Sequence, residues 1–224
     1  RFKVASADII DRKLHEYIAE TGKECLLAVG MATMEEIAAT LQLYERRGVK
    51  DRVVILPCVS AYPADPSDVN ISVMDTLRNQ FHCRVGYSDH TLGLECATAA
   101  AALGACVIEK HFTLDKNMPG PDHAASSTPA EFAALVKAVR IVEKALGDGI
   151  KRICDSEQEM RIISRKSIVV ATDLPKGCKL SESDFAYRRP GTGISPMQYP
   201  NLIGRTLVIS KKKGEQLIWE DLSE

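Results

Sequence analysis

The chain has 224 residues, 45% of them hydrophobic, and a formal net charge of −1, which suits one large globular domain, alone or with a smaller one. A balance this close to neutral provides no basic surface for nucleic acid or for an anionic membrane. The sequence contains neither a signal-peptide pattern nor an apolar run long enough to cross a bilayer. Seven cysteines without CxxC spacing indicate reduced thiols, so we expect a cytoplasmic protein.

Residues 1–147 alternate between strand and helix patterns. Short β-branched or apolar runs predict strands at 2–6, 24–30, 51–60, 83–88 and 106–112. Helical periodicity with Thr or Gly signals at the ends predicts helices at 9–21, 34–47, 69–81, 95–104 and 129–146. This alternation indicates an α/β fold with a parallel sheet and right-handed crossovers.

Polar side chains gather where the predicted strands end, among them Ser60, Ser88, His90 and Glu109. A (β/α)8 barrel places its chemistry at this face, and a doubly wound sheet uses the same edge. No Gly-rich phosphate fingerprint follows any strand, which favours the barrel. Five βα units are visible where a barrel needs eight. We therefore expect a partial barrel without its first three units, in a chain that is a fragment of a longer protein.

The sequence changes character after residue 147. Residues 148–164 are polar and predict a linker with some helix, and residues 165–224 predict a small domain of short strands and turns. Within that domain, residues 176–185 and 213–222 match at Lys, Gly, Leu and Asp. This near-repeat suggests two related β-arms packed on each other.

Two histidines end neighbouring predicted strands. Alternation along a strand puts Ser88 and His90 on one face, and likewise Glu109 and His111, with Lys110 on the opposite face. If the strands are parallel neighbours, both imidazoles point into one pocket. Two imidazoles with coordination positions left open suit an open divalent-metal site better than a closed structural one. The residues leave open the alternative that hydrogen bonds alone hold each histidine.

Six ordered motifs carry a resemblance to a known family. They are KVASAD (3–8), CVSAYPADPSDVN (58–70), GYSDHTLG (86–93), EKHFTLDK (109–116), MPGPDH (118–123) and RRPGTGISP (188–196). Together they resemble the sialic acid synthase family along the whole chain. The resemblance implies a (β/α)8 barrel at 1–147, of which the last five units are present, a linker at 148–164 and an antifreeze-like SAF domain at 165–224.

The resemblance also implies a reaction. Members of the family are metal-dependent transferases that condense phosphoenolpyruvate with N-acetylmannosamine or a related N-acyl sugar, giving N-acetylneuraminate or a related nonulosonic acid. Water adds to a cation at C2, and phosphate leaves with C–O cleavage. By this resemblance His90 and His111 bind Mn²⁺ or Mg²⁺, while Glu109 and Asp122 lie at the reacting centre. Which nonulosonic acid is made is left open.

The resemblance assigns the substrate contacts residue by residue. They are Lys3, Ser6, Asp8, Ser60, Tyr62, Ser88 and Arg189. A trianionic enol phosphate needs cations and hydroxyl donors, which Lys3, Ser6 and Ser88 can supply. Arg189 resembles a SAF-domain arginine that reaches the active site of the partner protomer, which implies a domain-swapped homodimer.

The sequence differs from the family at one position of the expected site, and two other functions are alternatives to the synthase. The family often has Ser-Thr-Gly-Met where this chain has Ala-Val-Gly-Met at 28–31, so one phosphate-binding hydroxyl is expected to be absent. Another phosphoenolpyruvate-dependent synthase of keto-deoxy sugar acids is an alternative, although such enzymes lack the SAF tail. A non-catalytic sugar- or metal-binding fragment is a second alternative.

Overall fold

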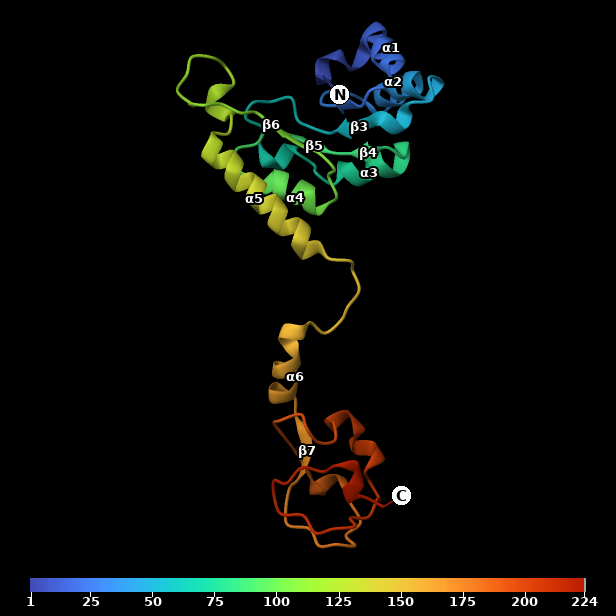
Figure 1. The fold of residues 1–224 in the computed structure, drawn as a ribbon, viewed down its shortest axis with the longest axis vertical. Coiled ribbons are helices and arrows are strands. Elements are labelled where there is room, and N and C mark those ends of the chain that lie inside the picture. The colour runs from blue at the N-terminus through green and yellow to red at the C-terminus, as the bar shows by residue number, and fades with distance from the viewer. Residues whose placement is uncertain (224) are drawn as a thin grey trace. The chain divides into compact units, whose positions relative to one another are not determined.

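The computed structural model describes residues 1–223. They form two compact units, one from Arg1 to Gly149 and the other from Ile150 onward. The first unit contains the parallel strands and most of the helices, and the second contains short β-segments and turns (Figure 1). No helix within residues 1–223 has both the length and the apolar character that a membrane span requires.

Strands and helices alternate through the first unit, which confirms the expected α/β pattern. The strands are β1 (Phe2–Val4), β2 (Cys25–Ala28), β3 (Val53–Leu56), β4 (Arg84–Val85), β5 (Tyr87–Asp89) and β6 (Ile108–Lys110). The helices are α1 (Arg12–Thr21), α2 (Met34–Arg46), α3 (Val73–Phe81), α4 (Glu95–Ala102) and α5 (Pro129–Leu146). Short 3₁₀ turns lie at Ser6–Ile10, Lys50–Arg52, Pro66–Asp68 and His123–Ala125.

All strand pairs of the first unit are parallel. Strands β1 to β4 pair in that order, and β5 pairs with β6. The strand expected at 83–88 is divided at Gly86, whose N–H still donates to the carbonyl of Ile55 in β3 at 2.9 Å. A Cβ at this position would lie 2.5 Å from Leu56 Cδ2 and 2.6 Å from the carbonyl oxygen of Val107. Glycine is therefore needed where the chain passes between its two neighbouring strands.

The helix ends follow the expected signals. Thr33 and Thr128 each form a capping box, with Glu36 and Glu131 respectively, which satisfies backbone N–H groups at the first turn. The helix expected from residue 9 starts later, at Arg12. Its first residues form the 3₁₀ turn Ser6–Ile10, and the Asp11 side chain then caps α1.

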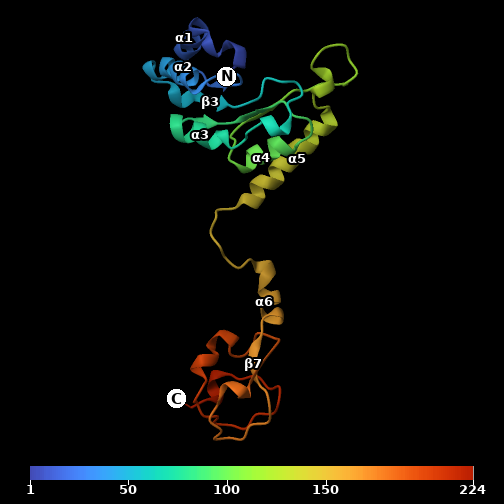
Figure 2. The same ribbon diagram turned by 180° about the vertical axis from the view of Figure 1, so that it is seen from behind.

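The core of the first unit lies around β3. All four residues of β3 are fully buried, as expected for a parallel strand covered on both faces. Helix α1 packs against α2, and α4 packs against α5; Figures 1 and 2 show both pairs from opposite sides. Burial of these apolar faces fixes the strand ends that carry the polar side chains.

The second unit contains helix α6 (Gln158–Ser164), which is followed by the antiparallel pair β7 (Ser167–Val170) and β8 (Phe185–Arg188). Its other regular elements are 3₁₀ turns at Asp155–Glu157, Glu182–Asp184, Pro196–Asn201 and Trp219–Asp221. A separate apolar cluster forms its core, with Ile168, Leu180, Leu202, Leu207 and Leu217 at its centre. This unit thus has a core of its own.

The near-repeat of the second unit adopts the same local structure twice. Its two glycines, Gly177 and Gly214, both have positive φ, 84° and 88°. In each copy an aspartate closes a 3₁₀ turn by accepting a hydrogen bond from a backbone N–H three residues earlier, at 2.8 Å for Asp184 and 2.9 Å for Asp221. The shared Gly and Asp therefore belong to two turns, a turn with a left-handed glycine and a 3₁₀ turn, each of which the sequence uses twice.

Candidate active site

A cavity of about 400 Å³ lies at the carboxyl ends of the parallel strands. This is the edge at which parallel α/β folds carry their ligand sites. The residues that line it are Lys3, Ala5, Ser6, Ala7, Ala28, Met31, Cys58, Ser60, Tyr62, Ser88, His90, Glu109 and His111. The cavity therefore brings together most of the site residues expected from the sequence, from five segments of the chain.

The two histidines face each other across the pair β5–β6. Their ring centroids are 5.2 Å apart with the planes at 85°, and Tyr62 lies against both rings, with centroid distances of 4.3 Å to His90 and 5.1 Å to His111. The register pairs Asp89 with Lys110, one residue before each histidine. Parallel pairing thus puts both imidazoles on the cavity side of the sheet.

The tautomer of His90 follows from one contact. Its Nδ1 lies 2.5 Å from the carbonyl oxygen of Val59, and because a carbonyl only accepts, Nδ1 must carry the proton. Nε2 therefore has a free lone pair, which lies 3.4 Å from the Ser88 hydroxyl. Burial lowers the pKa of His90 below its usual 6.5. A neutral imidazole held at Nδ1 by a carbonyl is the form in which proteins present Nε2 to a metal.

Glu109 is held in the cavity by two neighbours. The hydroxyl of Ser88 donates to its Oε1 at 3.2 Å, and the ammonium group of Lys3 lies 3.5 Å from the same oxygen. The side chains of Lys3 and Glu109 are both about one-third exposed, at 35%. A cation, a hydroxyl and a carboxylate thus meet beside the histidines, a set that can bind an anion and move a proton.

A tight cluster of small side chains forms another part of the cavity wall. Ser6 Oγ accepts a hydrogen bond from the N–H of Gly30 at 3.0 Å and lies 3.2 Å from Cys58 Sγ. A Cβ on Gly30 would come within 2.6 Å of Ser60 Oγ and 2.8 Å of Cys58 Sγ. Only glycine allows the backbone to approach these side chains this closely.

Ala28 and Cys58 also belong to this wall, the first as expected from the sequence and the second not. Ala28 lines the cavity at the strand end where the family often has a hydroxyl, so its methyl group occupies part of the wall. Cys58 was not expected at the site because its sequence context is apolar. It lies two residues before Ser60, at an alternating position of the same strand end, and this was the signal that could have indicated it.

Three of the expected residues lie outside the cavity. Asp122 is exposed, with Oδ2 3.9 Å from Nδ1 of His111. Asp8 is exposed in the turn after β1, where its carbonyl lies 3.2 Å from Nε2 of His15. Arg189 belongs to the second unit, where it is exposed.

A buried network supports the turn that carries Ser6 and Asp8. His15 is fully buried, and its Nδ1 lies 2.9 Å from the hydroxyl of Tyr44, which in turn lies 3.4 Å from Cys25 Sγ. Because the carbonyl of Asp8 accepts from Nε2, His15 carries its proton there and accepts from Tyr44. Burial lowers the pKa of His15, in keeping with a neutral ring.

The side chains at the cavity can be compared with the ligands that a divalent metal ion requires. Within residues 1–223, no three His, Cys, Asp or Glu side chains converge as a metal-binding group. A closed structural centre is therefore not formed by the described residues. Two imidazoles beside a roomy polar cavity instead fit an ion that takes its remaining ligands from water and substrate oxygens.

Comparison with known proteins identifies the family. Residues 1–151 match the sequence model of the NeuB family, and residues 165–223 match the SAF domain. The chain belongs to the NeuB family. The resemblance to sialic acid synthases read from the motifs is thereby confirmed, and the second unit carries the SAF domain of this NeuB-family chain.

Relatives in the family make several nonulosonic acids. The chain is 40% identical over 225 residues to N,N'-diacetyllegionaminic acid synthase from Legionella pneumophila, with 99% of this chain and 63% of the relative covered. It is 37% identical over 221 residues to pseudaminic acid synthase from Helicobacter pylori, with 99% and 65% covered. The chain therefore spans slightly less than two-thirds of the length of these curated relatives.

A solved structure supports the same relationship. N-acetylneuraminic acid (sialic acid) synthetase from Leptospira borgpetersenii, crystallised with citrate, matches at a TM-score of 0.65 and 37% identity. The match covers 70% of this chain and 55% of that one. Sequence and structure thus agree on a family of nonulosonic acid synthases.

Proposed function

We propose that this NeuB-family chain takes part in the condensation of phosphoenolpyruvate with an N-acylmannosamine-type sugar, giving a nonulosonic acid and phosphate. The observation that carries the proposal is the cavity itself, where Lys3, Ser88 and Glu109 meet beside His90 and His111. Each is a polar or charged group within a strand or directly after one, and together they match the charge and the proton transfers that this reaction requires.

The anion-binding groups all line the cavity. Lys3 brings the ammonium group, and Ser6 and Ser88 bring hydroxyls. Charge-assisted hydrogen bonds of this kind hold phosphate and carboxylate groups. In this proposal the three residues bind phosphoenolpyruvate, while Ser60 and Tyr62 form the wall that orients the sugar.

We propose His90 and His111 as the protein ligands of Mn²⁺ or Mg²⁺. The support is the free Nε2 of His90, the closeness of the two rings, and the space left for water and substrate oxygens. When bound, the ion would polarise the aldehyde of the open-chain sugar. Hydrogen bonding of His90 to Val59 fixes the ring that presents this ligand.

The protons are assigned to the two carboxylates. Glu109, oriented by the hydroxyl of Ser88, would take a proton from the water that adds at C2. A water held by Asp122, close to the ring of His111, would supply the proton that the aldehyde oxygen gains on becoming a hydroxyl group, and the proton taken by Glu109 would replace it. The C2–O bond to phosphate then breaks, and the second proton of the attacking water leaves with the phosphate as C2 becomes a ketone, so atoms and charges balance.

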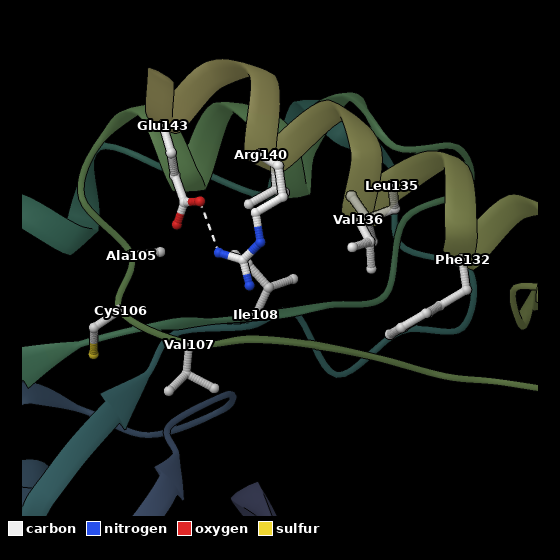
Figure 3. Close-up of a pocket in the computed structure, with 10 residues that line it drawn as sticks. Ala105, Cys106, Val107, Ile108, Phe132, Leu135, Val136, Arg140 and Glu143 are labelled. Carbon is white, nitrogen blue, oxygen red and sulfur yellow. Dashed lines mark hydrogen bonds and ion pairs between the residues drawn. The ribbon is translucent and has the colours of Figure 1, made fainter. Parts of the chain in front are cut away.

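We also propose that the parallel sheet is part of a (β/α)8 barrel. Within residues 1–223, β1 pairs only with β2 and β6 only with β5, which leaves two free parallel edges. A hollow of about 210 Å³ lies beside β6, with Val107 and Ile108 on one side, Phe132 and Leu135 of α5 on the other, and the ion pair of Arg140 with Glu143 in its lining (Figure 3). Parallel strands are normally covered on both faces and at their edges, so further α/β structure would fit here.

The proposal also includes a second protomer. Exposed Arg189 of the SAF domain would enter the active site of that protomer, in a domain-swapped homodimer that presents Asp8 and Arg189 to the sugar. The choice among N-acetylneuraminate, legionaminate and pseudaminate would depend on a few contacts to the sugar side chains, because a site that hydrogen-bonds a substrate group discriminates strongly against an analogue that lacks the group.

A phosphate-release assay tests the proposal. The chain is incubated with phosphoenolpyruvate, with and without Mn²⁺, and with N-acetylmannosamine or its diacetamido-trideoxy relatives in turn. Release that needs both the metal and one particular sugar supports the proposal and names the substrate. Release that is independent of every sugar would contradict it and indicate a phosphatase instead.

A further inference from the structure

Two buried charges lie directly behind the cavity histidines. Lys110 Nζ is 2.7 Å from Asp89 Oδ2, and the two side chains are only 3% and 0% exposed. Asp89 and Lys110 form the last register pair of β5 and β6, one residue before His90 and His111 respectively. Because side chains alternate along a strand, the ion pair faces away from the cavity. It therefore cannot touch a substrate bound between the histidines.

The ion pair also holds the residue after His90. Lys110 Nζ donates to the carbonyl of Thr91 at 2.7 Å. The N–H and hydroxyl of Thr91 both donate to Asp89 Oδ1, at 3.0 Å and 2.8 Å. Lys110 of the neighbouring strand thus holds the side chain that precedes His90 and the backbone carbonyl that follows it, and the chain runs from Lys110 directly into His111.

Stability alone does not account for this arrangement. Taking two charges out of water costs about as much free energy as their attraction returns, so apolar residues of similar volume often serve as well. The geometry here is more specific than a stabilising contact requires. With the hydroxyl of Tyr87, which donates to Asp89 Oδ1 at 3.5 Å, five hydrogen bonds and ion-pair contacts converge between two strand ends, and both strand ends carry an imidazole.

We propose that Asp89, Lys110 and Thr91 form a clamp that sets the separation and orientation of His90 and His111. They are positioning residues, and they act through the backbone of the histidines. The inference rests on the proposed function, in which these histidines bind a divalent ion. Two imidazoles that must share one ion tolerate little relative movement, and groups that orient metal ligands affect metal affinity almost as strongly as the ligands do.

The test uses a double variant and a matched control in the 224-residue chain. Asp89→Asn with Lys110→Met removes both charges and keeps their volumes, so no buried charge is left unpaired. The control is Asp221→Asn with Lys211→Met, which removes the other buried ion pair, at 2.6 Å with exposures of 4% and 12%. That pair lies in the second unit, away from the histidines in sequence and in a separate core.

Mn²⁺ alone is the probe, titrated by electron paramagnetic resonance after circular dichroism has shown that both variants are folded. We expect Mn²⁺ to bind 10- to 100-fold more weakly to the clamp variant, and to bind the control variant within twofold of the unmodified chain. Equal affinity in the clamp variant would overturn the inference. If the double variant does not fold, Thr91→Val removes one bond to Asp89 at nearly constant shape, and a several-fold weaker affinity is expected.

A second readout separates this inference from the proposed function. Long-range ¹H–¹⁵N spectra of the metal-free chain report the histidine tautomers. The clamp predicts a single Nδ1–H tautomer for His90 in the unmodified chain and a mixture in the clamp variant. If the unmodified chain binds no Mn²⁺, the proposed metal site fails, and these spectra still decide on the clamp. Identical His90 signals in both proteins would refute it.

Discussion

The hydroxyl of Ser88 donates a hydrogen bond to Oε1 of Glu109, at 3.2 Å, across the register pair that joins β5 to β6. The carboxylate therefore has a fixed direction within the cavity, next to the ammonium group of Lys3. This is the arrangement expected of a general base that must meet a substrate in one orientation.

Replacement of that carboxylate tests its role. We expect Glu109→Gln to lower the rate constant kcat of sugar-dependent phosphate release by 10²- to 10⁴-fold, because general acid–base catalysis contributes about that much. The amide keeps the size of the side chain, so Mn²⁺ affinity should change little. Steady-state kinetics measure the fall in kcat, and a Mn²⁺ titration measures the metal affinity. Activity within threefold of the unmodified chain would exclude Glu109 as the base.

Loss of one imidazole tests the metal site. His111→Ala should abolish the dependence of activity on divalent metal together with most of the activity, since only one protein ligand remains. His82→Asn is the matched control: His82 is exposed at the end of α3 with φ of 52°, a conformation that asparagine tolerates. Isothermal titration with Mn²⁺ should show lost binding in the first variant and normal binding in the second. Normal binding in both would show that His111 is not a ligand.

The methyl group of Ala28 offers a gain-of-function test. Ala28→Ser would add a hydroxyl to the cavity wall where the family often has one. A single hydrogen bond contributes about 1 kcal/mol, so the KM for phosphoenolpyruvate should fall roughly fivefold. Val29→Thr serves as the control, because Val29 belongs to the apolar core and does not line the cavity. A KM that stays the same or rises in Ala28→Ser would mean that phosphate binds elsewhere.

The buried ring of His15 predicts a pH dependence of stability. Burial lowers the pKa of His15 in the folded state below the usual 6.5, which the unfolded chain retains. As the pH falls below 6.5, the unfolded state takes up a proton that the folded state does not, so the free energy of unfolding decreases. It reaches a lower plateau once the pH is below the pKa of the folded state. Well above pH 6.5, where the ring is neutral in both states, this group contributes no slope.

His15→Gln should remove this contribution and leave the rest of the profile. Hydrogen exchange of the amides in β2 and β3 at pH 7.5, 6.5 and 5.5 measures it, since these buried strands report the opening of the first unit. The unmodified chain should lose stability between pH 6.5 and 5.5, by at most about 1.4 kcal/mol from this group. The variant should lose less, and an equal loss in both proteins would exclude His15 as the cause.

Much of the fold could be predicted because its signals are local. The Thr caps of α2 and α5 and the apolar runs of β2 and β3 are each set by a few consecutive residues. Strand alternation also pointed to Ser88, His90, Glu109 and His111 as one group, and the structure has all four around one cavity.

The remaining features depend on register and close approach, which no local pattern specifies. Gly86 divides a strand because Leu56 and Val107 lie against it. The pairing of Asp89 with Lys110 follows from the alignment of β5 with β6. Cys58 joins the site through its contact with Ser6, a residue 52 positions away in the chain. Such relationships between distant segments became visible only in three dimensions.

The most direct test of the proposed condensation is the fate of the bridging oxygen of phosphoenolpyruvate. The chain is given Mn²⁺, the sugar, and phosphoenolpyruvate labelled with ¹⁸O between C2 and phosphorus, and the products are analysed by mass spectrometry. The proposal predicts that the label leaves in inorganic phosphate, only when the sugar is present, together with an unlabelled nonulosonic acid. Label retained in pyruvate, or phosphate released without sugar, would contradict it.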